Sequence, residues 1–300
     1  MAVREIAPGV FVETEHLGSN NSIVSTPEGL VLIDLPHRPT DAMRWRRVAA
    51  SMGETAFIIN TDHHIDHSMG NRFVPGLVVG HELTRRQLIE NAPGFDYVRD
   101  LVATIDPEGL PLVQDYVTRA PTITFSDRMA LDMGGGLRLE LIHLPGHTPN
   151  STYVTLDAYG ILFSGDLFCE LGLPAFAEAC VHDWLEAVRF LETVDADWIV
   201  PGHGQVSRPS AVTPFREAME NLIGEVEHGI ERGDDRASLA ETIRFEDRIH
   251  VSTGGSPAYP DYLIERFQRQ SIETIHDQIL ERRDASNLRR AQLRPTGETP

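Results

Sequence analysis

The sequence predicts an α/β fold followed by a helical appendage, and three observations predict it. The chain has 300 residues, enough for one large α/β domain with a substantial core or for one domain plus an appendage. Up to about residue 212, short apolar runs rich in strand-forming residues alternate with stretches of helical periodicity. From Thr213 the apolar residues repeat only at helical spacing, over two longer stretches.

The opening of the chain predicts three strands joined by turns, at residues 10–12, 22–24 and 30–34. A helix is expected over 40–52, with Thr40 as its N-cap. The run 56–59 is apolar and too short for a globular helix, so it is expected to be a buried strand that ends at Asn60.

The middle of the chain continues the alternation. The expected strands are residues 77–80, 122–125, 137–142, 152–156, 160–164 and 197–200, and the expected helices are 82–91 and 182–194. Residues 91–120 contain several prolines and are expected to form short helices in a cleft wall. His81 is interpreted as a helix-start or buried structural residue, and His143 as a residue on the sheet face.

The C-terminal third divides the chain into three predicted parts: a domain of residues 1–212, a helical appendage of 213–283 and a flexible tail of 284–300. The appendage is expected to pack beside the site as a lid or against a second subunit, which would make a homodimer. Tyr259 and Tyr262, at the head of its last helix, are candidates to cap a substrate.

Composition excludes several function classes. The formal charge is −19, which repels phosphate backbones and anionic lipid, so neither nucleic acid nor a membrane is expected as a partner. All the basic residues are arginine, which excludes a Schiff-base or P-loop lysine. The two cysteines, Cys169 and Cys180, are expected to be free thiols, although one bridge is the alternative. With no apolar leader and no run of membrane-spanning length, a cytoplasmic location is expected.

A cluster of histidine and aspartate follows the strand of residues 56–59. Three imidazoles and two carboxylates occupy the six residues from Asp62 to His67, and such clusters commonly bind metal. Later, His147, Asp166 and His203 each come directly after a glycine at the end of a strand-like run. A glycine there lets the backbone turn tightly, so that several strand ends can direct side chains into one cleft.

These segments resemble the motifs of the metallo-β-lactamase-fold hydrolases. The motif His-x-His-x-Asp-His aligns with residues 62–67, and the later histidines and aspartate follow in the same order over about residues 5–210. One position departs from the pattern, because Asp62 stands where the family has its first histidine. His63 is the alternative ligand, but alternate residues of an extended segment point the same way, which groups residue 62 with 64 and 66.

The resemblance implies an αββα sandwich and two metal ions, with Asp166 bridging them. The first ion would be held by Asp62, His64 and His147, and the second by Asp66, His67 and His203. Zinc is the expected metal, while the extra carboxylate makes manganese or iron an alternative. Asp34 and His37 lie just past a strand and either contact these ligands from behind or belong to a plain turn.

The function implied is that of a metal-dependent hydrolase acting on a small molecule. A metal-bound hydroxide, oriented by Asp66, would attack an ester, lactone, thioester or similar bond. The apolar loop of residues 167–181 either lines the substrate pocket or packs as ordinary core. Two rival hypotheses are an iron-containing redox enzyme for oxygen or sulfur chemistry on the same fold, and a non-catalytic binding protein.

Overall fold

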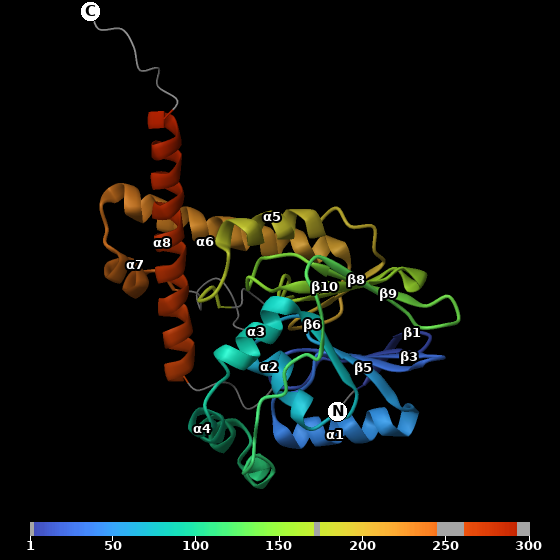
Figure 1. Cartoon of the computed structure of the whole chain (residues 1–300). Helices are drawn as coiled ribbons and strands as arrows, with labels where there is room; N and C mark the ends of the chain where they lie inside the picture. The colour runs from blue at the N-terminus through green and yellow to red at the C-terminus, as the bar shows by residue number, and fades with distance from the viewer. Residues whose placement is uncertain (1–2, 171–174, 245–260, 293–300) are drawn as a thin grey trace, which may run out of the picture.

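A computed structural model describes residues 3–170, 175–244 and 261–292, and its framework is two sheets packed face to face (Figure 1). The first sheet has seven strands in the order β1-β2-β3-β4-β5-β6-β7. Its strands are β1 Arg4–Ala7, β2 Val10–Glu13, β3 Asn21–Thr26, β4 Gly29–Ile33, β5 Thr55–Ile59, β6 Leu77–His81 and β7 Ile123–Phe125. β1 to β4 pair antiparallel, whereas β4 to β7 pair parallel.

The second sheet has five strands in the order β12-β11-β10-β9-β8. They are β8 Arg128–Asp132, β9 Arg138–His143, β10 Thr152–Leu156, β11 Ile161–Gly165 and β12 Trp198–Pro201. Only β11 and β12 pair parallel, so the loops that follow these two strands leave the sheet on the same side.

Helices cover the outer face of each sheet (Figure 1). α1, Pro39–Met52, packs Trp45 and Ala49 on the first sheet, while α5, Val181–Leu191, and α6, Val212–Arg232, pack on the second. The remaining helices are α2 Ile65–Ser68, α3 Glu82–Glu90, α4 Phe95–Ile105, α7 Arg236–Thr242 and α8 Asp261–Gln292, with 3-10 turns at Met69–Arg72, Pro107–Leu112, Asp157–Tyr159 and Pro209–Ala211.

Three apolar clusters hold these layers together. The central cluster lies between the sheets, where Val31 and Ile59 of the first meet Val154 and Phe163 of the second. Each sheet is therefore covered on both faces, by the other sheet and by helices. This fits the continuous apolar runs of the parallel strands in the first sheet. The αββα sandwich expected from the resemblance and the C-terminal helices expected from the helical periodicity are both confirmed.

Several details differ from the sequence predictions. β1 and β8 were not expected, and the helix α7 was not separated from its neighbours. Thr40 is not the N-cap of α1: Arg38 occupies that position, and the Thr40 hydroxyl donates instead to Asp106, at 2.9 Å. α8 continues to Gln292, so residues 284–292 are helical where a flexible tail was predicted, while 293–300 lie outside the described residues.

Candidate metal centre

The candidate site is built from loops that leave the ends of β5, β9, β11 and β12. The loop after β5 is fixed by Asn60, whose side-chain amide donates to the His67 carbonyl oxygen at 3.0 Å, and by Asn71, which donates to Asn60 at 2.7 Å. Two glycines, Gly165 and Gly202, allow the turns after β11 and β12 to lie close to neighbouring parts of the site. A Cβ on Gly165 would lie 2.6 Å from the Thr61 hydroxyl, and one on Gly202 would lie 1.9 Å from Asp166.

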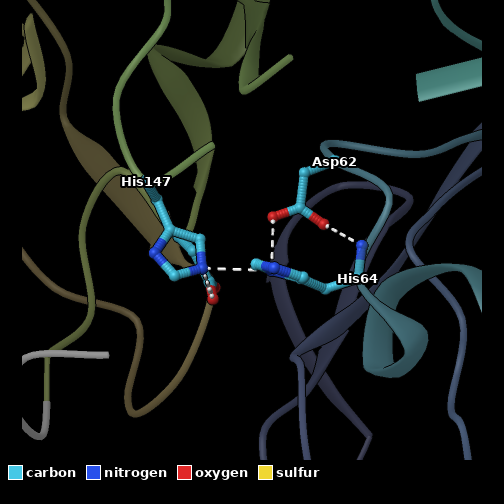
Figure 2. A group of neighbouring side chains, drawn as sticks. Asp62, His64 and His147 are labelled. Carbon is cyan, nitrogen blue, oxygen red and sulfur yellow. Dashed lines mark hydrogen bonds and ion pairs between the residues drawn. The ribbon is translucent and has the colours of Figure 1, made fainter. Parts of the chain in front are cut away.

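The structure brings the seven predicted site residues together in two adjoining groups. Asp62, His64, His147 and Asp166 form one group, whose ligand atoms all lie within 4.8 Å of one another. Figure 2 shows three of these side chains facing each other across the gap between two loops. His147 Nε2 lies 3.1 Å from His64 Nδ1, and His64 Nδ1 lies 3.3 Å from Asp62 Oδ2.

The second group consists of Asp66, His67 and His203. His203 Nε2 lies 3.4 Å from Asp66 Oδ2, and His67 Nε2 lies 3.8 Å from the same oxygen. Asp166 stands between the two groups: Oδ1 is 3.4 Å from His67 Nε2 and 3.3 Å from His203 Nε2, while Oδ2 is 3.4 Å from His147 Nε2. One carboxylate therefore faces both groups.

The donor atoms fit metal ions better than they fit each other. Two ligand atoms that each bind one ion at about 2.1 Å with tetrahedral angles lie roughly 3.4 Å apart, which is the spacing found around Asp166. Among the described residues, Asp62 Oδ2, His67 Nε2 and Asp166 Oδ1 are buried without a hydrogen-bond partner. Because buried polar atoms are costly without hydrogen bonds, these atoms are well placed to bind a cation.

Asp62 and its neighbour His63 face different surroundings. The Asp62 carboxylate lies in the first group, and its Oδ1 also accepts the backbone N–H of His64, at 2.8 Å. The His63 ring lies 3.0 Å from Glu178, through Nε2, and 2.8 Å from the Asn150 amide, through Nδ1. Residue 62 therefore groups with His64, His147 and Asp166, whereas His63 groups with His64 and Glu178, and the role of Asp62 as a ligand stays a prediction.

Burial and neighbouring charges shift the pKa values of the side chains in the site. Burial alone would raise the pKa of Asp166, but the charges of His203 and His67 outweigh burial and hold that pKa well below its usual range. Burial would likewise lower the pKa of His64, yet Asp62 raises it to about 9. For His147 burial prevails and lowers the pKa to about 4. Neutral imidazole is the form that binds metal, so His147 is already in that form at neutral pH.

Asp34 supports the site from behind. Its Oδ2 accepts His67 Nδ1 at 2.9 Å and the Thr61 hydroxyl at 2.6 Å, while its Oδ1 accepts the Thr61 backbone N–H at 2.9 Å. This arrangement leaves His67 Nε2 pointing at the cluster, because a carboxylate that holds one ring nitrogen fixes the orientation of the other. Of the two roles left open for Asp34, the structure shows the contact with a site residue.

The site forms the floor of a cavity of about 970 Å³. Asp66, His147, Asp166 and His203 reach it from the floor, and His37 also lines it. α4 and α8 supply further parts of the wall, including Tyr97 and Phe267. Of the two capping candidates, Tyr259 lies outside the described residues, and Tyr262 is exposed and does not line the cavity.

The loop of residues 167–181 was expected either to line the cavity or to pack in the core, and its described residues do both. Cys169, Ala175 and Glu178 line the cavity, whereas Phe168 and Phe176 are buried in the core; residues 171–174 lie outside the described part. Both cysteines are free. Sequence reasoning did not find Glu178, which pairs with His63 over 115 positions, and no local pattern marks it.

α8 holds this loop through side chains on one helical face. Ser271 Oγ accepts the Phe176 N–H at 2.8 Å, and Gln278 accepts the Val181 N–H at 2.9 Å while donating to the Ala179 carbonyl at 2.5 Å. Residues 271 and 278 are two turns apart on the same face of the helix. The C-terminal helix therefore positions the segment that carries Glu178.

Two stacked histidines lie apart from the cluster. His81 is the N-cap of α3, where Nδ1 accepts the Leu83 N–H at 3.2 Å, and its ring stacks on that of His143 at 3.8 Å. His143 Nε2 lies 2.9 Å from the Pro149 carbonyl oxygen. Both have the structural roles that were predicted for them.

An αββα sandwich with two adjoining groups of histidine and aspartate at the ends of its strands defines a class of metal-binding proteins. The family model for the metallo-beta-lactamase superfamily matches residues 16–203. The chain belongs to this superfamily, as the resemblance of its motifs predicted.

One known protein matches part of the sequence, and solved structures share the fold. The chain is 28% identical over 123 residues to a beta-lactamase-like protein 2 homolog of Caenorhabditis elegans, a match that spans 39% of each chain. A metallo-beta-lactamase from Pontibacter korlensis superposes with a TM-score of 0.57 at 25% identity, covering 73% of this chain and 99% of its own. A stereoselective inverting sec-alkylsulfatase from a Pseudomonas species gives 0.67 at 14% identity, covering 92% of this chain and 50% of its own.

No helix within the described residues is both long enough and apolar enough to cross a membrane.

Proposed function

We propose that this protein is a metal-dependent hydrolase that cleaves an ester, lactone, thioester or similar bond of a small molecule. The observation that supports this best is the convergence of seven ligand-type side chains around shared gaps, with three buried nitrogen or oxygen atoms that make no hydrogen bond within the described residues. A site that only stabilised the fold would have no reason to open into a cavity of about 970 Å³.

The residues divide into two ligand sets. Asp62, His64 and His147 would hold one ion, Asp66, His67 and His203 the other, and Asp166 would bridge them. Such ions supply a water with a lowered pKa and polarise the bond to be broken. Zinc is the expected metal, with manganese or iron as alternatives because the first set contains a carboxylate.

The chain itself orients the reactants. Asp66 Oδ2 lies 3.4 Å from His203 Nε2, and its side chain lines the cavity, so the carboxylate can accept a hydrogen bond from the attacking water. For an ester, lactone or thioester, water adds to the acyl carbon, the bond to the leaving oxygen or sulfur breaks, and that atom takes up the proton. The cavity is of the size that binds small molecules, and apolar side chains such as Leu101 and Ile264 form part of its wall.

The names of the structural relatives define which substrates to try. One relative is named as a beta-lactamase and another as a sec-alkylsulfatase, so a panel would contain β-lactams and alkyl sulfates beside esters, lactones and thioesters. Since one site on this fold can serve several reactions, the panel decides between them.

The test compares His147→Ala with His143→Ala. His147 lies in the cluster, while His143, four residues earlier, packs on His81 outside it. Purified proteins are assayed for bound metal by elemental analysis and for turnover of the panel. We expect His147→Ala to lose bound metal and to lower the rate at least 100-fold, and His143→Ala to keep both. Wild-type protein with two ions per chain and no turnover of any substrate would contradict the proposal.

A further inference from the structure

The described wall of the cavity includes one arginine that forms no ion pair with a described carboxylate. Arg266, near the start of α8, lines the cavity above the cluster, and it is the only arginine among the described lining residues. The chain has no lysine, so this guanidinium is also the only permanently charged cationic side chain that the described wall presents. The cavity also presents carboxylates, but those of the candidate metal centre belong to the two ligand groups, and Glu178 contacts His63.

Arg266 differs from the other arginines whose side chains are described on α8. Arg269 lies 3.8 Å from a carboxylate oxygen of Glu241, Arg283 lies 3.3 Å from Glu231, and Arg282 lies against His182 at 2.6 Å. In contrast, no described carboxylate or carbonyl lies within bonding distance of the Arg266 guanidinium. The guanidinium instead lies over the ring of Phe267, with Cζ 5.3 Å from the ring centroid.

The contact with Phe267 leaves the donors of Arg266 available. A guanidinium over an aromatic face is held by its charge, while its N–H groups stay in the plane and point away from the ring. Phe267 itself lines the cavity, as do Leu263 and Ile264 one turn earlier. Residues 263, 266, 267 and 270 recur at the spacing of one helical face and all line the cavity, so the exposed Arg266 side chain lies beside the apolar Leu263 and Phe267.

We propose that Arg266 is a specificity-determining residue which binds a carboxylate at the far end of the substrate. The inference rests on the proposed hydrolase function and names the substrate class: an acyl compound with an apolar middle and a terminal carboxylate. The fork of N–H groups on a guanidinium matches the two oxygens of a carboxylate. A single cation balances a single negative charge, which favours a carboxylate over a doubly charged phosphate ester.

The kinetic test uses pairs of esters that differ only at the far end. Monophenyl esters of the linear diacids from succinate to suberate are compared with phenyl esters of the monoacids of equal length. We expect wild-type protein to prefer the carboxylate member of at least one pair. In Arg266→Gln the ratio of the two kcat/KM values falls roughly 10- to 100-fold, the range of a charge-assisted hydrogen bond. Arg266→Lys keeps part of the preference, and Arg269→Gln, the control on the same helix, keeps all of it.

A binding test separates this inference from the hydrolase proposal. Metal-free protein is titrated calorimetrically with monomethyl suberate and with methyl octanoate, so that neither turnover nor a metal–carboxylate bond contributes. Tighter binding of monomethyl suberate, lost in Arg266→Gln, supports the carboxylate site even if no ester is hydrolysed. Equal binding of the two probes, together with hydrolysis that ignores the terminal carboxylate, overturns the inference and leaves the hydrolase proposal standing.

Discussion

Asp34→Asn isolates the effect of the hydrogen bond behind His67. Asp34 is buried, and its carboxylate accepts from His67 Nδ1 at 2.9 Å and from the Thr61 hydroxyl and backbone N–H. The backbone at Asp34 has a φ of 51°, a conformation that asparagine adopts as readily as aspartate. The substitution therefore keeps the shape and the turn, and it replaces one accepting oxygen with a donor.

The expected loss follows from those contacts. An N–H that faces the amide group of the variant loses its acceptor, which costs about 1–3 kcal/mol of folding free energy. The orientation of His67 is lost with it, and partners of this kind contribute about 10- to 100-fold to metal affinity, or about 1.4–2.8 kcal/mol. We therefore expect zinc to bind one to two orders of magnitude more weakly than to wild-type protein.

Asp106→Asn is the matched control. Asp106 is buried too, and it accepts the backbone N–H and hydroxyl of Thr40 at 2.8 and 2.9 Å, the same pattern that Asp34 makes with Thr61, but it does not belong to either ligand group. Zinc affinity is measured by competition with a chromophoric chelator, and stability by chemical unfolding of the metal-free proteins. If both variants are destabilised alike and both bind zinc as wild type does, Asp34 has no special role in the metal centre.

The remaining predictions concern the metal, the pH and the C-terminal helix. Removing metal with a chelator should lower the melting temperature, because zinc at 100 times its Kd stabilises by about 2.7 kcal/mol; an unchanged melting curve would count against a bound ion. Asp62→His should shift the metal preference from manganese toward zinc in competition experiments, and an unchanged preference would remove residue 62 from the ligands. Burial, and then the neighbouring His143, lower the pKa of His81; the unfolded chain therefore binds this proton more readily, and stability is lost as pH falls through about 6.5. His81→Asn retains a cap of about 1 kcal/mol without titrating, so it should lose less stability than wild type between pH 8 and pH 5, and equal losses would contradict that origin. Gln278→Ala should cost about 1–2 kcal/mol and speed amide exchange at Val181, and unchanged exchange would mean that α8 does not hold the loop.

The sequence predicts the parts of this molecule that depend on local pattern. The apolar runs mark most of the strands, and a histidine or aspartate directly after such a run indicates where loops meet at one edge of the sheets. The seven residues named from these patterns do lie together, although their roles as ligands, like the homodimer contact and the domain boundaries, stay predictions.

Contacts between distant segments were not predictable in the same way. Thr40 has the sequence features of an N-cap, but its hydroxyl is bonded to Asp106, 66 positions away. Glu178 and Arg266 lie in the cavity only because α8 returns to the domain and packs beside the loop of residues 175–181. The short strand β1, with four residues, and β8, with two large apolar residues, Met129 and Leu131, leave weak signals in the chain.

The return of α8 has a consequence for any shortened version of the protein. The family match ends at residue 203, yet Ile272, Ile275 and Ile279 of α8 share one apolar cluster with α5 and α6. A fragment cut at that boundary would keep the seven candidate ligands but lose the part of the cavity wall that α8 supplies. The part of this apolar cluster that α6 and α8 cover would also meet water, so such a fragment should aggregate during expression, which solubility trials of nested truncations can measure.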